Sequence, residues 1–195
     1  ATQLRRINRI RFRGREVPFT EGNIIGAIEK LKEPRASGLL KTNEDLTDLL
    51  LLGTSLDQTI DGETRGFQLR FIDWERPENN IFHLCAEFEV ERSRSHETRR
   101  PDLVLFVNGI PLSVIECKAP SEDWAQAVSQ HLRNQQDDEI PGLFRTVQFL
   151  RHRSTCKPYL ASELCYSPRV LRESTKPSSW PACRATRKSG RFARL

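Results

Sequence analysis

The sequence lacks several features that would assign a protein to a class at once. Its 195 residues include no methionine, and no apolar run approaches the roughly 18 residues that a membrane-spanning helix needs. The N-terminus carries no apolar segment of the kind found in secretory signals. The five cysteines form no Cys-x-x-Cys pair, and this odd count favours a reducing compartment over a disulfide framework. We therefore expect a cytoplasmic protein without a membrane partner.

Charge is unevenly distributed along the chain. The total is +5, from 31 basic and 26 acidic residues. Residues 1–150 carry 20 basic and 24 acidic side chains, a net charge of −4, whereas residues 151–195 carry 11 and 2, a net charge of +9. The basic balance that would suggest a nucleic-acid partner therefore comes from the last 45 residues alone.

Composition and hydrophobic periodicity divide the chain into three parts. Residues 1–19 form an Arg-rich arm with little pattern, and residues 20–150 form the folded domain. Residues 151–195 are basic, rich in Arg, Ser and Pro, and poor in apolar periodicity. We expect this tail to be disordered or irregular and to lie outside the fold, and we hypothesise that it comes from a shifted reading frame.

Within the domain, the patterns predict alternating helices and strands. Helices are expected at 20–32, with Thr20 as a cap, and at 43–52, ending at Gly53. A third helix begins after Ser121, buries the stripe Trp124, Val128 and Leu132, and ends before Pro141. Strands are expected at 67–73, 82–90, 103–107 and 112–117. This order predicts an α/β fold with a central mixed sheet flanked by helices.

The last two strands form the hairpin that carries the chemistry. Asn108-Gly109 between apolar runs is a strong hairpin signal. If the turn is centred near Gly109, Asp102 lies opposite Glu116, and their Cβ atoms are about 5 Å apart. Glu116 and Lys118 share one face of their strand, since side chains alternate. Two carboxylates and one ammonium group therefore converge at one edge of the sheet.

This arrangement suits hydrolysis of a phosphodiester. Two neighbouring carboxylates repel each other, and a hard divalent cation such as Mg²⁺ relieves the repulsion. A metal-bound water has a lowered pKa, and Lys118 can position it or stabilise developing negative charge. The alternative is a solvated face, on which a Glu-x-Lys pair contributes less than about 1 kcal/mol.

A longer stretch of the chain resembles the N-terminal domain of the R (restriction and motor) subunit of type I restriction enzymes. The residues that carry the resemblance lie between 71 and 144. They are Ile72-Asp73, Pro77-Glu78-Asn79-Asn80, Arg100–Leu112 (RPDLVLFVNGIPL), Val114–Pro120 (VIECKAP) and Ile140–Phe144 (IPGLF). The resemblance implies a restriction-endonuclease-like (PD…ExK) core that cleaves duplex DNA with Mg²⁺.

The resemblance also assigns roles to single residues and implies partners. Asp102 and Glu116 match the family's metal-binding acids, and Lys118 matches its catalytic lysine. Gln130 matches the glutamine of a DNA-proximal Gln-x-x-x-Tyr motif, but Asn134 stands where tyrosine is expected. Modification and specificity subunits are the implied partners.

Some features leave other interpretations open. ATP would act only through the motor region of a full-length R subunit, because no phosphate-loop motif occurs here. The chain could also be a truncated inactive remnant or a DNA-binding and docking module. Glu87 is interpreted as solvated rather than as a third metal-binding acid, and Glu21 and Glu29 remain candidates for a further acid.

Overall fold

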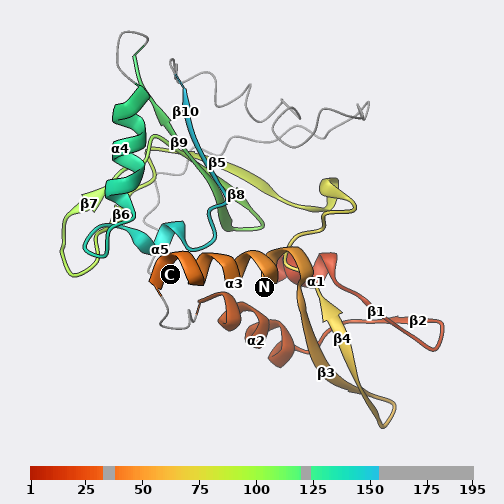
Figure 1. Cartoon of the computed structure of the whole chain (residues 1–195). Coiled ribbons are helices and arrows are strands. Elements are labelled where there is room, and N and C mark those ends of the chain that lie inside the picture. The colour runs from red at the N-terminus through yellow and green to blue at the C-terminus, as the bar shows by residue number, and fades with distance from the viewer. Residues whose placement is uncertain (33–37, 120–123, 154–195) are drawn as a thin grey trace. The chain divides into compact units, whose positions relative to one another are not determined.

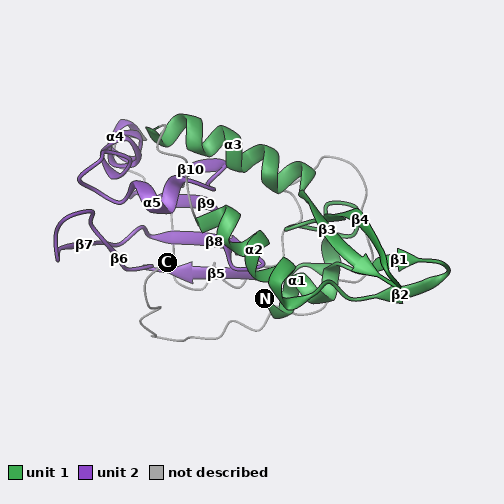
Figure 2. Cartoon of the chain, turned by 90° about the horizontal axis from the view of Figure 1, so that it is seen from below, with its two compact units in different colours: residues 1–81 green, residues 82–195 purple. Residues whose placement is uncertain are grey.

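The computed structural model describes residues 1–32, 38–119 and 124–153. The chain forms a mixed α/β structure that divides into two compact units, Ala1–Ile81 and the part that begins at Phe82 (Figure 2). No helix in the described ranges is both long and apolar enough to cross a bilayer. The predicted boundary at residue 150 is corrected, because residues 151–153 belong to a strand that spans Phe149–Arg153. The rest of the tail predicted to be irregular, from position 154 onward, lies outside the described residues.

The helices of the first unit are α1 (Thr2–Ile7), α2 (Glu21–Lys32) and α3 (Gly38–Leu52). Helix α2 follows the prediction, because the Thr20 hydroxyl accepts a hydrogen bond from the Asn23 backbone N–H at 3.3 Å. Helix α3 begins five residues before the predicted start. It ends as predicted at Gly53, whose φ of 75° and close approach to the Leu69 carbonyl leave no room for a side chain.

The predicted N-terminal arm is instead folded, which corrects the sequence-based interpretation of residues 1–19. After α1, strands β1 (Ile10–Phe12) and β2 (Arg15–Val17) form a hairpin that buries Ile10 and Phe12. A second hairpin pairs β3 (Thr54–Ile60) with β4 (Glu63–Leu69). Strand β3 was not predicted, and β4 begins four residues before the strand expected at 67–73.

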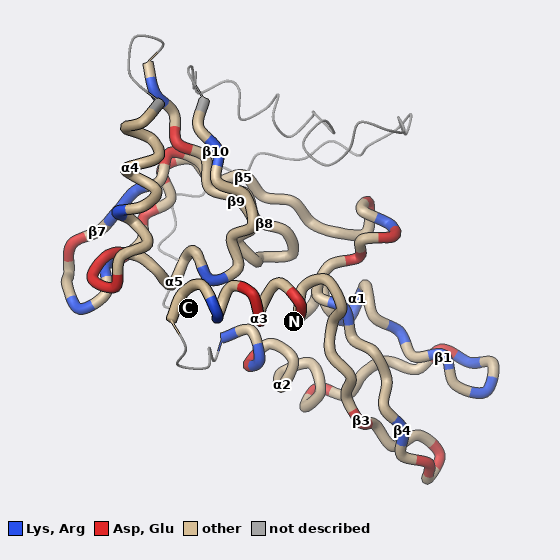
Figure 3. Tube along the Cα trace, in the orientation of Figure 1, with Lys and Arg blue, Asp and Glu red and all other residues tan. Residues whose placement is uncertain are grey.

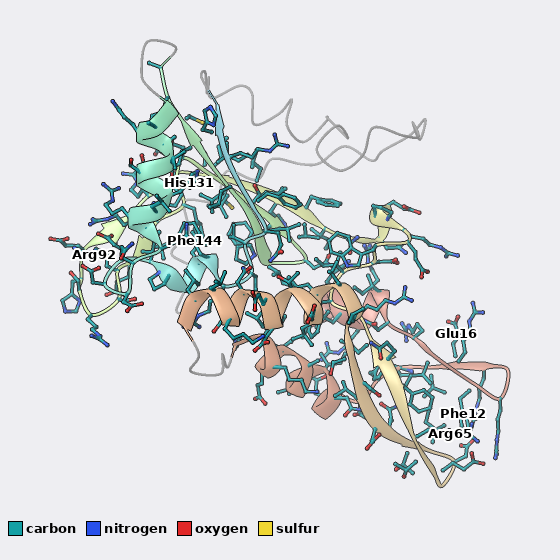
Figure 4. All side chains as sticks on the ribbon, in the orientation of Figure 1. Phe12, Glu16, Arg65, Arg92, His131 and Phe144 are labelled. Carbon is teal, nitrogen blue, oxygen red and sulfur yellow. The ribbon has the colours of Figure 1, made fainter. Side chains whose placement is uncertain are left out.

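Arginines of the first hairpin are used within the unit. Arg13 pairs with Glu63, and Arg15 pairs with Asp61. The guanidinium groups of Arg13 and Arg65 lie 5.2 and 5.6 Å from the centroid of the Phe12 ring. Figure 4 labels Phe12 and Arg65. Basic and acidic positions are accordingly interspersed along these hairpins (Figure 3). Arginines of this segment therefore form ion pairs with neighbouring acidic residues, and the segment does not present a uniform basic surface.

The second unit is built on a four-stranded mixed sheet (Figure 1). Its strands are β5 (Phe82–Ala86), β8 (Leu103–Val107), β9 (Ile110–Cys117) and β10 (Phe149–Arg153), in the order β10-β9-β8-β5. Strand β10 runs parallel to β9, and the other pairs are antiparallel. The short hairpin β6 (Val90–Glu91) and β7 (Thr98–Arg99) follows β5. Strand β5 stops before the predicted end because Glu87 has a φ of 50°.

The connection from β9 to β10 contains α4 (Trp124–Asn134), α5 (Pro141–Phe144) and the chain between them. Helix α4 contacts both β9 and β10. Pro141 begins α5 rather than closing α4, and the predicted cap Ser121 lies outside the described residues. Strand β10 was not predicted, and it extends the sheet beyond the hairpin.

The burial of α4 differs from the prediction. Val128 and Leu132, expected in the core, are 39 and 58 % exposed, and the third stripe residue, Trp124, has no described side chain. The buried positions are Ala127, His131 and Asn134, which are spaced by four and three residues along one face. Helix α4 therefore turns a largely polar face towards the sheet.

Candidate functional site

The hairpin of β8 and β9 brings Asp102 and Glu116 together. The pairs Leu103↔Ile115 and Val104↔Val114 continue directly to Asp102 opposite Glu116, and both valines are fully buried. The Asp102 Oδ2 atom accepts a hydrogen bond of 2.6 Å from the backbone N–H of Cys117. Asp102 is therefore fixed against the strand that carries Glu116, as the sequence predicted.

A β-bulge sets this register. The turn residues Asn108 and Gly109 have φ values of 55° and 85°, which is the two-residue hairpin geometry. Near the turn Val107 faces Ile110, but the pairing shifts by one residue between Leu105 and Phe106, leaving Leu112 as the extra residue of β9. Without that extra residue, Asp102 would lie opposite Ile115 and on the other face from Glu116.

Glu116 is buried in an environment that disfavours its charge. Its side chain has no exposure to solvent. Burial, followed by the neighbouring Asp102 carboxylate, raises the pKa of Glu116 from 4.5 to about 8, while Lys118 and Arg133 act in the opposite direction. The Glu116 Oε1 atom has no hydrogen-bond partner within the described structure. Such a carboxyl group is protonated at neutral pH unless a cation compensates its charge.

Gln130 of α4 connects the acid to the lysine. Its amide nitrogen donates a hydrogen bond of 2.6 Å to Glu116 Oε2, and its amide oxygen accepts one of 2.8 Å from Lys118 Nζ. Lys118 fixes the amide orientation, because its ammonium group can only donate and therefore must face the amide oxygen. All four residues that the sequence proposed for the site, Asp102, Glu116, Lys118 and Gln130, therefore lie in one connected cluster.

An open pocket of about 440 Å³ borders this cluster. Its lining comes from Lys118 and from one side of α4, namely Ala125, Gln126, Ser129, Gln130 and Arg133. The pocket carries the two cationic groups of Lys118 and Arg133, and Gln130 lies between it and Glu116. Sequence reasoning did not single out Arg133, although its position seven residues after Gln126 places both on one helix face.

The residues could hold a divalent cation through two carboxylates. In the described ranges, no group of three or more His, Cys, Asp or Glu side chains forms a metal cluster. Mg²⁺ is commonly bound through one or two carboxylates, with water completing its shell. Glu116 has an Oε1 atom without a partner and a raised pKa. A carboxyl group that binds a cation is expected to show both features when the cation is absent.

Comparison with known proteins gives the family. The model described as "Type I restriction enzyme R protein N terminus" matches residues 1–151. The chain belongs to this family.

The relatives are named as endonuclease subunits. The HindI endonuclease subunit of Haemophilus influenzae is 33 % identical over 127 residues, which cover 64 % of this chain and 12 % of that protein. The "Putative type I restriction enzyme MjaIXP endonuclease subunit" of Methanocaldococcus jannaschii is 34 % identical over 106 residues, covering 53 % of this chain and 10 % of that protein. This chain spans about a tenth of the length of these relatives.

Two further positions are informative within this R-protein N-terminal domain. Asn134, at the position where the sequence resemblance expects tyrosine, is buried, and its Oδ1 atom has no partner in the described part of the chain. Glu87 is exposed, and its carboxylate accepts a hydrogen bond of 2.6 Å from Arg100. The exposed, paired carboxylate agrees with the solvated role predicted for Glu87, although its backbone N–H donates a 2.8 Å hydrogen bond to the Asp102 carbonyl and so places Glu87 next to the cluster.

The remaining acid candidates lie elsewhere in the chain. Glu21 and Glu29 are exposed residues of α2 in the first unit, and Glu21 pairs with Arg5. A role for either in the site stays a prediction.

The acidic run 137–139 is not uniformly exposed, because its last residue is buried. Glu139 is 5 % exposed and receives a 2.6 Å contact from Arg99, which lowers the pKa of Glu139.

Strand β10 contributes residues that sequence reasoning assigned no function. His152 pairs in register with Glu116, which places the two side chains on the same face of the sheet. The ring of His131 lies 3.1 Å from the Arg151 carbonyl oxygen, and burial lowers the pKa of His131. Strand β10 lies here because the crossover through α4 returns the chain parallel to β9. The short apolar pair Phe149-Leu150 was the signal in the sequence that could have predicted this strand.

Proposed function

We propose that this chain is the endonuclease domain of a type I restriction enzyme R subunit, hydrolysing phosphodiester bonds of double-stranded DNA with Mg²⁺. The observation that carries the proposal is the cluster in which Gln130 joins buried Glu116 to Lys118, with Asp102 opposite Glu116. The names of the relatives support an endonuclease activity of the proteins in which this family occurs. Modification and specificity subunits are the proposed partners in the complex.

Asp102 and Glu116 would hold the metal ion. The bound ion would supply a water of lowered pKa and would neutralise charge on a phosphate oxygen. The pKa of Glu116, about 8 in this structure, supports this assignment, because occupation of the site requires loss of that proton and gives the buried carboxylate a counter-charge. The backbone N–H of Cys117 keeps Asp102 oriented for the same role.

Lys118 is proposed to stabilise the negative charge that develops on the phosphate. Its ammonium group is held 2.8 Å from the Gln130 amide oxygen, so its position does not depend on a flexible side chain alone. A charge fixed in advance near the reacting group contributes more than one that must reorient during the reaction. The neutral amide leaves the full positive charge of Lys118 available to the substrate.

We also propose that the second unit is a restriction-endonuclease-like core. In support, its mixed sheet presents the two acids from adjacent antiparallel strands, and α4 covers the same edge with Gln130. The first unit and the residues beyond 153 have no part in this argument.

The proposal is tested by Mn²⁺ titration of the 195-residue chain together with DNA cleavage by the assembled complex. We expect Asp102→Asn and Glu116→Gln to remove Mn²⁺ binding and cleavage, and Lys118→Ala to remove cleavage while leaving Mn²⁺ binding. Glu87→Gln is the matched control, because Glu87 neighbours Asp102 through its backbone while its carboxylate is exposed and paired with Arg100.

Three results would contradict the proposal. They are cleavage retained in all three site variants, Mn²⁺ binding by the Asp102→Asn chain equal to that of the parent, or no Mn²⁺ binding by the parent chain. The last result would favour an inactive remnant or a docking module.

A further inference from the structure

We infer that the groove along α4 binds the phosphate backbone of a DNA strand beside the acidic cluster, with Arg133 as a phosphate-contacting residue. This inference rests on the proposed function, because it names the substrate contact next to the same site. It concerns a surface that the metal-binding acids themselves do not form, since Gln130 lies between the groove and Glu116.

The groove has the side chains that a phosphate backbone requires. Its lining positions on α4 are spaced by three, one and three residues, so that they form one stripe of hydrogen-bonding and cationic groups: Gln126, Ser129, Gln130 and Arg133. Seven residues of helix span about 10 Å, which is close to three nucleotide steps of one strand at about 3.4 Å each. None of the described residues that line the groove carries a carboxylate.

The positive charge of Arg133 is available to a ligand. Arg133 is an exposed residue, and its guanidinium group has neither an ion pair nor a hydrogen bond among the described residues. This differs from Arg92, Arg99 and Arg100 of the same unit, each of which is paired with glutamate.

Arg133 and Lys118 line the same groove from two different elements. Lys118 follows directly after β9, and Arg133 lies on α4. A polyanion lying in the groove would therefore be held by two cations from different elements while one of its phosphates approaches Asp102 and Glu116.

The way α4 packs agrees with a role of its polar stripe in binding DNA. The apolar residues Val128 and Leu132 lie on another face of the helix and are exposed, while the polar stripe borders the site. A helix selected only for packing would bury those apolar side chains. The sequence instead keeps glutamine, serine and arginine at the groove.

The experiment measures binding of the 195-residue chain to a 20-base-pair fluorescent duplex by anisotropy, in EDTA, between 50 and 200 mM KCl. We expect Arg133→Gln to weaken binding several-fold and to reduce the slope of log K against log salt by about one. Gln126→Glu, which places a negative charge in the groove, should weaken binding to a similar extent. Both residues are exposed, and thermal melting checks that the variants fold.

Matched controls separate the groove from general charge effects. Arg94→Gln removes an exposed arginine of the same unit at the tip of the β6–β7 hairpin, and Leu132→Glu adds a negative charge to α4 outside the groove. We expect both control variants to bind DNA within about twofold of the parent chain. Since EDTA removes divalent metal, binding in this assay does not require a metal ion held by Asp102 and Glu116.

The outcomes distinguish this inference from the proposed function. Unchanged binding in Arg133→Gln, equal losses in the groove and control variants, or no binding by the parent at 50 mM KCl would overturn the groove assignment, whatever the Mn²⁺ titration shows. Equal affinity for a single-stranded RNA or heparin of similar charge would overturn the assignment to DNA. Weakened binding in the groove variants alone would support it even if the chain bound no Mn²⁺.

Discussion

Replacing Glu116 by glutamine should stabilise the metal-free protein while removing its metal site. Glu116 is fully buried next to Asp102, and these two conditions raise its pKa from 4.5 to about 8. Between these values the folded chain binds one proton more than the unfolded chain, so the free energy of unfolding falls as pH rises through this window. Glutamine has nearly the same shape, never ionises, and still accepts the hydrogen bond from Gln130.

The magnitude follows from the shift. Each pKa unit corresponds to about 1.4 kcal/mol in the free energy of unfolding. The difference in free energy of unfolding between Glu116→Gln and the parent is therefore near zero at pH 4.5. It reaches about 3 kcal/mol at pH 7 and levels off at about 5 kcal/mol above pH 8. For a chain of this size, about 3 kcal/mol corresponds to an increase in Tm of roughly 6 to 12 °C.

The assay is urea or thermal unfolding of parent and Glu116→Gln in EDTA at half-unit steps from pH 4.5 to 9. Glu139→Gln is a control of opposite sign, because Arg99 lowers the pKa of that buried carboxyl group. Its stabilising contribution is present above the unfolded pKa near 4.5 and is lost as pH falls. Glu139→Gln should therefore destabilise the chain at neutral pH and lose its effect in acid.

A second arm adds Mn²⁺ at pH 7.5. A ligand that binds only the folded state raises its stability, so the parent should gain stability with Mn²⁺ concentration and Glu116→Gln should not. A difference between the two proteins that does not change from pH 5 to 8, or a variant less stable than its parent at pH 7, would refute the assignment of a raised pKa to Glu116.

Further predictions concern the same cluster. Mn²⁺ affinity of the parent should rise about tenfold per pH unit up to about pH 8, because Glu116 must lose its proton, and a flat titration by calorimetry would contradict this. Gln130→Leu removes both the acid and the lysine hydrogen bonds and should lower Mn²⁺ affinity by roughly 10- to 100-fold, whereas an unchanged affinity would show that the bridge has no positioning role. Deletion of Leu112 should abolish Mn²⁺ binding although Asp102 and Glu116 remain; circular dichroism checks folding, and retained binding would refute the role of the bulge.

Local signals predicted the elements that position the site. Asn108-Gly109 between two apolar runs placed the hairpin, and alternation along β9 placed Glu116 and Lys118 on one face. The glycine after α3 and the threonine before α2 gave helix boundaries that the structure confirms. These features depend on a few neighbouring residues, which is why a single sequence contains them.

Contacts between distant segments were the ones that could not be predicted. Helix α4 shows an apolar stripe at Val128 and Leu132, yet it buries His131, because Gln130 and His131 have hydrogen-bond partners on β9 and β10. Periodicity records which residues could be buried, but satisfied polar groups can be buried as well. The N-terminal hairpin was missed for a similar reason, since Phe12 is covered by arginines paired with the β3–β4 hairpin.

The opposition of Asp102 and Glu116 was predicted correctly from an incorrect turn geometry. A turn centred on Gly109 gives the right partners, but the actual turn contains Asn108 and Gly109 and is centred between them. That turn alone would pair Asp102 with Ile115 and turn the carboxylate away from Glu116. The bulged residue Leu112 adds the missing position and restores the pairing. The geometry of the acid pair therefore depends on an apolar residue that makes no chemical contribution of its own, and the deletion of Leu112 tests this dependence directly.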